Sequence, residues 1–163
     1  MFASSQIIFV NARGDACLEW LFAELPKHIP FRCSRTEWVG FTTTIPQILI
    51  ETAPVALTIQ VDDDPEYVPE EIAELADEME SKLPPDVHAE LKKCNARLDV
   101  MSASSNEPEI TEEAITVVAQ TDLDPQSDQV DRVVRALSKL CNGFVNDCIY
   151  GGLLCPGDDT WIT

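Results

Sequence analysis

The stretch Val55–Glu80, VALTIQVDDDPEYVPEEIAELADEME, contains the pattern that decides the fold class. Its first seven residues, Val55–Val61, are rich in β-branched side chains and are followed by Asp62, and this pattern predicts a central strand. Beyond Pro65 and Pro69, apolar residues recur at the spacing of one helix face and predict an amphipathic helix. These apolar residues are Ile72, Leu75, Ala76, Met79 and Leu83. A strand that leads into such a helix indicates a domain built from both kinds of element.

The polar side of the same stretch is entirely acidic. Residues 62–80 contain ten acidic residues and no Lys or Arg. One interpretation is a solvated helix face that keeps the protein soluble, but such a surface usually mixes both signs because like charges repel. The other interpretation is a surface shaped to meet a cationic partner. The candidate partner-binding residues are Asp62, Asp63, Asp64, Glu66, Tyr67, Glu70, Glu71, Glu74, Asp77 and Glu78.

Four elements are predicted before this stretch. Residues 6–10, QIIFV, form a β-branched and aromatic run typical of a buried strand. Residues 16–25 predict a helix that Pro26 stops. Residues 31–44 alternate enough for one or two strands, and residues 43–52, TTIPQILIET, predict a short helix with Thr44 as its cap.

The rest of the chain adds two helices and two strands to the prediction. Residues 86–94 predict a helix, residues 96–103 a strand, residues 104–113 an exposed loop and residues 114–121 a strand. The strongest periodicity is helical and extends from Val130 to Cys148, over about five turns. Ser127 or Asp128 is its expected cap, and Gly151 with Gly152 its expected end. The tail is expected to dock through Leu153, Leu154 and Trp161.

Taken together, these elements predict an α+β fold for residues 1–163 as a single domain. The expected sheet is mainly antiparallel or mixed and is covered by helices on one side, with a long amphipathic C-terminal helix. A chain of 163 residues that is 45% hydrophobic is long enough to bury one substantial core.

The negative charge is concentrated in the middle of the chain. The net charge is −18, and residues 62–113 alone contain 17 acidic and 4 basic residues. Phosphate binding requires clustered Lys or Arg, so nucleic acid is excluded as an expected partner. A basic protein is the partner that the charge favours.

The cysteines and the N-terminus predict a cytoplasmic protein. The N-terminus has no basic region, and its apolar run is too short for a signal peptide. No segment approaches the apolar length of a membrane span, so no membrane partner is expected. The six cysteines, which are Cys17, Cys33, Cys94, Cys141, Cys148 and Cys155, are therefore expected to be reduced.

No catalytic, metal or cofactor motif emerges from the sequence. The two histidines, His28 and His88, have no nucleophile at a spacing that places it on the same helix face. Cys141 and Cys148 fall two turns apart on the expected helix, about 10 Å by the helical rise, which is too far to share a zinc ion. Acidic runs that begin at Asp62 and Asp122 lack the glycine and glutamate of a calcium loop. No cofactor, no metal and no catalytic residue are therefore predicted.

In size, single-domain organisation and the anionic block Asp62–Glu80, the chain resembles the immunity proteins of bacterial toxin systems. Asp122, Asp124 and Asp128 extend the acidic character. The resemblance implies a protein that neutralises a basic partner, a toxin or nuclease, after electrostatic steering. Tyr67 and Val68 are the expected apolar anchor. A variant of this hypothesis is mimicry of nucleic acid, in which carboxylates occupy a phosphate-binding site.

Two other functions are compatible with the sequence. The alternative is a small enzyme or ligand-binding domain whose site is assembled from distant residues, such as Glu37, Trp38, Asp147 and Tyr150. A buried polar pocket with perturbed carboxylates away from the acidic helix is the feature that would favour it. A third hypothesis is an oligomerising structural component.

Overall fold

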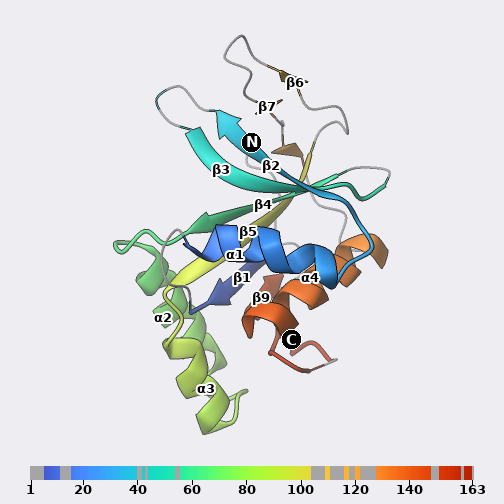
Figure 1. Ribbon diagram of the computed structural model, residues 1–163. Coiled ribbons are helices and arrows are strands. Elements are labelled where there is room, and N and C mark those ends of the chain that lie inside the picture. The colour runs from blue at the N-terminus through green and yellow to red at the C-terminus, as the bar shows by residue number, and fades with distance from the viewer. Residues whose placement is uncertain are drawn as a thin grey trace.

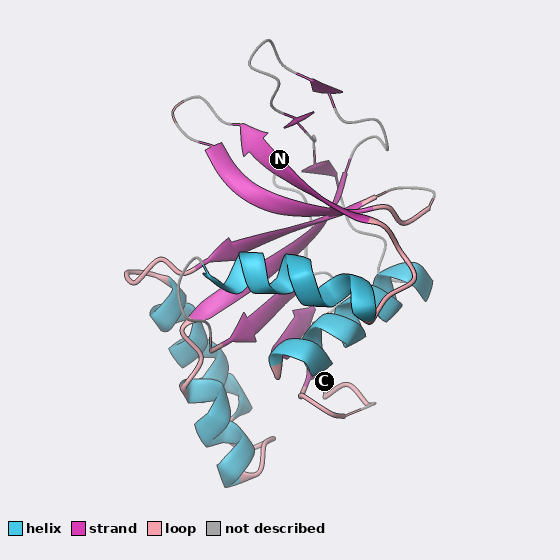
Figure 2. Ribbon diagram, in the orientation of Figure 1, coloured by secondary structure: helices cyan, strands magenta, loops and turns pink. Residues whose placement is uncertain are grey.

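The computed structural model describes residues 6–11, 16–39, 42, 44–53, 56–103, 109–110, 116–117, 120–121, 128–147, 151–158 and 160–162 (Figures 1 and 2). The helices are α1 (Ala16–Glu24), α2 (Val68–Met79), α3 (Pro85–Lys92) and α4 (Asp128–Cys141), and a 3-10 turn, η1 (Leu25–Lys27), follows α1. The longer strands are β1 (Gln6–Val10), β2 (Cys33–Val39), β3 (Thr44–Ile50), β4 (Leu57–Asp62), β5 (Ala96–Ala103) and β9 (Phe144–Asp147). The two-residue strands are β6 (Glu109–Ile110), β7 (Thr116–Val117), β8 (Gln120–Thr121) and β10 (Leu153–Leu154).

These strands form one sheet in the order β10-β9-β1-β5-β4-β3-β2-β7-β6, and β8 pairs with β5. Every neighbouring pair is antiparallel except β2 and β7, which are parallel. The prediction of an α+β fold with a mainly antiparallel sheet is therefore confirmed. The strand of the Val55–Glu80 stretch, β4, lies inside the sheet between β3 and β5, also as predicted.

Helices cover both faces of the sheet, so the expectation of a single covered side was wrong. In β1, Ile8 and Val10 join a core with α1 and α4, whereas Phe9 points the other way into a core with α2 and α3. Figure 1 shows α1 and α4 in front of the sheet and the α2/α3 pair at its lower left. The physical reason lies in the run QIIFV, because a strand with apolar residues on both faces must be covered twice.

The larger core lies between the sheet and the α1/α4 layer. It contains fully buried Leu and Ile side chains from helices and strands alike, each of which contributes about 1.5–3 kcal/mol by leaving water. The largest of them are Ile8, Leu21, Leu25, Ile48, Ile50, Leu57, Ile59, Leu98 and Leu137. The tail docks as predicted, because Leu153 and Leu154 are buried and Trp161 packs against this core.

The helix predicted for residues 43–52 was wrong, because this segment forms β3. Ile48 and Ile50 contact the α1/α4 core while Gln47 and Leu49 point to the opposite face, which is the alternation of a strand. Pro46 lies opposite Glu37 in the β2–β3 ladder and outside the part of β3 that pairs with β4, which begins at Ile48. The missing N–H of the proline therefore leaves no gap in the β3–β4 ladder.

The long C-terminal helix was predicted correctly in its first part only. Helix α4 ends at Cys141, and residues 144–147 form β9 instead of continuing the helix. Asn142 adopts a left-handed φ of 52°, a conformation that stops a helix and that asparagine tolerates. The Ser138 hydroxyl donates to the Gly143 carbonyl at 2.7 Å and fixes this end. Gly151 and Gly152 follow β9 rather than a helix.

The segment between β5 and α4 differs from its prediction where the structure describes it. Two residues of the expected loop pair as β6 with β7. The expected strand at residues 114–121 is represented by two separate short strands, β7 and β8, which pair with β2 and β5. The neighbouring residues 104–108, 111–115, 118–119 and 122–127 lie outside the described residues, and with them the expected cap Ser127.

We predict that Gly143→Ala destabilises the fold. A Cβ at this position would lie 2.6 Å from Cγ2 of Ile8 and 2.9 Å from Cγ1 of Val10, and both of these side chains are fully buried. Overpacking of this kind costs about 1–3 kcal/mol. Urea denaturation should therefore give a lower midpoint at an unchanged slope, and a midpoint equal to that of the unmodified protein would contradict this packing.

Candidate functional site

Helix α2 presents one apolar and one acidic side. Val68, Ile72, Leu75, Ala76 and Met79 are buried against the sheet and α3. Four acidic residues of the helix point outward and are exposed. None of the four forms an ion pair among the described residues. We call this surface the acidic face of α2, and it consists of Glu70, Glu74, Asp77 and Glu78.

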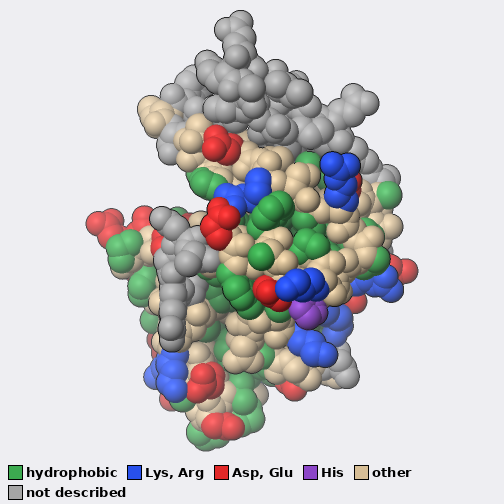
Figure 3. Space-filling model, viewed as in Figure 1, with side chains coloured by type: hydrophobic (Ala, Val, Ile, Leu, Met, Phe, Trp, Pro, Cys, Tyr) green, Lys and Arg blue, Asp and Glu red, His purple; other side chains and the backbone are tan. Residues whose placement is uncertain are grey.

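The loop before α2 is shaped by its own aspartates. Oδ1 of Asp62 accepts the backbone N–H of Asp64 at 3.1 Å, and Oδ1 of Asp64 accepts the N–H of Glu66 at 2.8 Å. Such side-chain to backbone bonds hold a turn in one conformation. Figure 3 shows acidic side chains at the left of the molecule, where this loop projects, and several Lys and Arg side chains on the right. The loop therefore adds acidic side chains to the left edge of this face, and other acidic and basic side chains are scattered over the rest of it.

Arg97 of β5 lies at the centre of the contacts between α2 and the sheet. Its Nη1 donates to both carboxylate oxygens of Glu71, at 2.8 and 2.7 Å, and its Nε lies 3.6 Å from Oδ2 of Asp62 and 3.2 Å from Oδ1 of Asp99. Asp62 stands directly opposite Arg97 in the β4–β5 ladder. One guanidinium thus compensates carboxylates from β4, α2 and β5.

Tyr67 completes this cluster at the surface. Its ring lies 5.7 Å from the Arg97 guanidinium and its hydroxyl donates to Oδ2 of Asp62. The bond to Asp62 raises the pKa of Tyr67 to about 12, so the phenol stays protonated. The side chain remains 42% exposed and lies beside the acidic loop.

Asp99 is the least satisfied carboxylate of the cluster. Burial raises its pKa to about 6, against an opposing effect of Arg97. The distance between Nε of Arg97 and Oδ1 of Asp99 is that of an ion pair, yet neither atom has a hydrogen-bond partner among the residues that the structure describes. Attraction without a directed hydrogen bond leaves the desolvation of Asp99 only partly offset, which explains the direction of the shift.

A shallow groove lies beside the acidic face. It has a volume of about 350 Å³ and is lined by Pro69, Ile72, Ala73 and Asp77 of α2, together with Lys92 and Cys94. Its floor is mostly apolar, and Asp77 belongs both to the groove and to the acidic face. The groove therefore offers an apolar contact next to the negative charge.

The structure separates the predicted partner-binding residues into two groups. Asp62, Tyr67 and Glu71 are engaged around Arg97, and Asp64 shapes its own loop. The residues whose side chains remain exposed and free of ion pairs among the described residues are Asp63, Glu66, Glu70, Glu74, Asp77 and Glu78. Val68 was wrongly expected to anchor a partner, because its side chain is fully buried in the core beneath α2.

Sequence reasoning missed Arg97 and Asp99. The signal was their position, because both alternate with Leu98 and Val100 in a segment that was predicted to be a strand. Charged residues on one face of an internal strand need partners when that face is covered. Because helices were expected on a single side of the sheet, the face of β5 that carries Arg97 and Asp99 was expected to be exposed to solvent.

The alternative site proposed from distant residues is not assembled. Glu37 lies in β2 and Asp147 in β9, and β1, β5, β4 and β3 lie between these two strands. Five strand spacings of about 4.8 Å place them on the order of 20 Å apart. The side chains of Trp38 and Tyr150 lie outside the described residues, as do Asp122 and Asp124.

The two histidines and the five described cysteines occupy ordinary structural positions, and Cys148 lies outside the described residues. Nε2 of His88 lies 2.7 Å from the carbonyl of Ala76 and links α3 to α2, and His28 is exposed. Cys17, Cys33, Cys94, Cys141 and Cys155 are free thiols, and burial raises the pKa of each. Within the part of the chain that the structure describes, no three metal-binding side chains converge on one point.

Comparisons with known proteins give no relative for this chain. It matches no protein-family model, no curated protein and no solved structure. Among the described residues, no helix has the length and apolar character needed to cross a membrane.

We predict that Asp99→Asn becomes increasingly stabilising as the pH rises. The carboxyl titrates near its ordinary value of 3.8 when unfolded and near 6 when folded. Between these values the unfolded chain releases a proton that the folded chain keeps, so stability falls with rising pH. Asparagine has no titrating proton. The free energy of unfolding of the variant, relative to that of the unmodified protein, should therefore rise by about 1 kcal/mol between about pH 5 and pH 7.5. Urea denaturation at the two pH values measures this difference, and a value independent of pH would contradict the shift.

Proposed function

We propose that this chain is an acidic protein-binding module that neutralises a basic partner protein, as an immunity or inhibitor protein of a bacterial toxin does. The observation that carries the proposal is the acidic face of α2, whose four carboxylates are exposed and lack a cation among the described residues. Glu70 and Glu74, like Glu74 and Glu78, are four residues apart on the helix. Like charges at this spacing repel by about 0.2–0.5 kcal/mol per pair, a cost that a cationic partner would remove.

The anchoring of α2 supports this proposal. Five apolar side chains and the Glu71–Arg97 ion pair fix the helix on the sheet, so the outward carboxylates have a defined spacing. A surface that is ordered before binding loses less entropy when it binds. Its negative field steers a basic protein toward it and speeds association, and the effect weakens as salt is added.

The groove beside the acidic face supplies the second part of an interface. Long-range charge gives association rate and orientation, whereas affinity depends on a few desolvated contacts. An apolar side chain of the partner would enter between Ala73 and Lys92, with a neighbouring cation on Asp77. Tyr67, which is exposed at the start of α2, is the chain's own aromatic contact.

We predict that Glu74→Gln/Glu78→Gln weakens capture of the partner. The tagged full-length chain is used to bind proteins from a native-cell lysate at low salt and at about 0.5 M salt, where charges are screened beyond a few Å. A single basic protein, released at the higher salt, is the expected result. The double variant should then associate with that purified protein about tenfold more slowly at low salt.

The matched control is Glu51→Gln/Asp131→Asn, which removes the same amount of charge from exposed positions that were not assigned to the partner-binding surface. The control should retain most of the association rate. Equal losses in the two double variants would show that only the net charge matters and would refute a docking face on α2. Competition with DNA for the same partner distinguishes nucleic-acid mimicry from binding at another site of that partner.

A further inference from the structure

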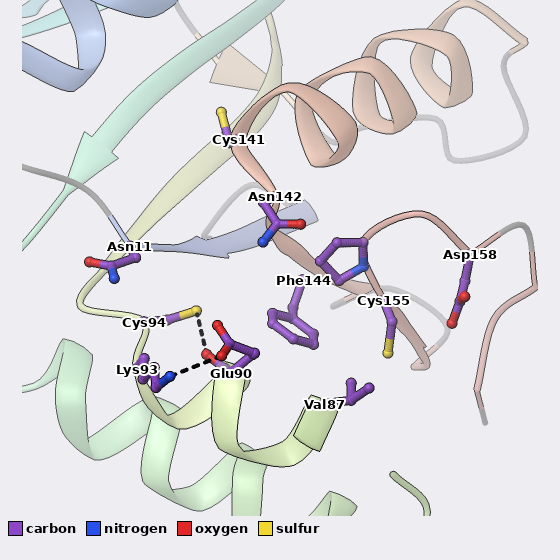
Figure 4. A pocket seen from close by; sticks show the side chains of 11 residues that line it. Asn11, Val87, Glu90, Lys93, Cys94, Cys141, Asn142, Phe144, Cys155 and Asp158 are labelled. Carbon is purple, nitrogen blue, oxygen red and sulfur yellow. Dashed lines mark hydrogen bonds and ion pairs between the residues drawn. The ribbon is translucent and has the colours of Figure 1, made fainter. Parts of the chain in front are cut away.

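A second cavity, which shares Cys94 with the groove beside α2, lies among elements far apart in the sequence. Its volume is about 410 Å³, within the range of about 300–1,000 Å³ that is usual for small-molecule sites. It is bounded by α3, by the end of β1, by the end of α4 and by the segment after β10 (Figure 4). No residue of α2 lines it, so it is separate from the acidic face.

The floor of this cavity is apolar. Cys94, Phe144 and Cys155 are each less than 9% exposed, and Val87 and Pro156 extend the apolar lining. Burial raises the pKa of Cys94 to about 12 and also raises that of Cys155, so both thiols are neutral. Neutral thiols are poor nucleophiles and poor metal ligands, and the floor is therefore a surface for binding rather than for covalent chemistry.

The rim is polar and carries more negative than positive charge. Lys93 is the one cation among the described lining residues, and its Nζ is already bound to Oε1 of Glu90 at 2.9 Å. Asp158 has no ion pair within the described part of the chain. In Figure 4 the Phe144 ring lies between Glu90 on one side and Asp158 on the other.

The negative field of the rim reaches the floor. Glu90 contributes to the raised pKa of Cys94, and Asp158 contributes to the raised pKa of Cys155, in each case after burial. Asn142 lines the same space in Figure 4, and its left-handed backbone holds it at the end of α4. An anion would meet unfavourable charge here, whereas a cation with an apolar body would match both the rim and the floor.

We infer that this cavity binds a small organic ammonium group, with its apolar chain on Phe144 and its charge on Asp158. The same chemistry is available from a free alkylamine or from a lysine side chain of another protein. This inference does not depend on the proposed docking role of α2.

The test compares three probes that share one apolar chain: pentylammonium, 1-pentanol and pentanoate. Binding to the full-length ¹⁵N-labelled protein is followed by NMR through the side-chain amide of Asn142 and the backbone amides of Cys94, Phe144 and Cys155. Pentylammonium should shift these signals at the lowest concentration and pentanoate at the highest. Equal affinities for the ammonium and the alcohol, or no shift at these residues, would overturn the assignment.

Asp158→Asn should weaken pentylammonium binding about fivefold, as expected for loss of a partly exposed charge pair, and leave 1-pentanol binding unchanged. Glu51→Gln is the matched control, because it removes the same charge from an exposed position outside the cavity and outside the acidic face of α2, and it should have no effect. Equal weakening of pentylammonium binding by both variants would show that only the net charge of the protein matters, and would refute a binding site at Asp158. Binding of Nα-acetyl-lysine amide is measured in the same way to identify where the ammonium group comes from. Tighter binding than that of pentylammonium indicates a lysine side chain of another protein, and weaker binding indicates a free alkylamine.

Discussion

The ion cluster around Arg97 is the interaction on which the position of the acidic helix depends. Asp62, Glu71 and Asp99 approach this guanidinium from three different elements, and all four side chains are less than one third exposed. Carboxylates in such a place are costly unless they are paired, and Arg97 is the cation that pairs them. Because Glu71 and the five buried apolar side chains of α2 are held inward, the other acidic side chains of α2 face the solvent. The contacts around Arg97 thus help to fix the direction in which the exposed carboxylates of α2 point.

The second constraint is the two-sided burial of β1. With Ile8 and Val10 on one face and Phe9 on the other, the sheet needs a helical layer on each side. The α1/α4 layer forms the larger core, and the α2/α3 pair carries the acidic face on a separate layer. The cavity proposed to bind an ammonium group lies around Phe144, where the end of α4 and the C-terminal segment meet α3. Both proposed binding surfaces therefore follow from the same topology.

The sequence predicted the elements whose periodicity is unambiguous, and failed where two periodicities overlap. Strands β1, β4 and β5 and helices α2 and α3 were predicted because each shows one clear pattern. Residues 43–52 were misassigned because an early proline resembles a helix start, whereas pairing with β2 decides the outcome. The helical pattern of α4 was extended too far, since Phe144 and Val145 fit a helix face as well as a strand. The acidic face was predicted in part, but Arg97 was not, because its role depends on a helix layer that no local pattern indicates.

We propose that the exposed charge of α2 recognises a basic protein, whereas the buried charge around Arg97 stabilises the fold. Hydrogen–deuterium exchange of the chain, alone and in complex with the basic protein that it captures, tests this division most directly. Binding should slow exchange in Val68–Met79 and in the loop before it, and β5 should be equally protected in both states. Protection confined to other elements, with α2 unchanged, would contradict it.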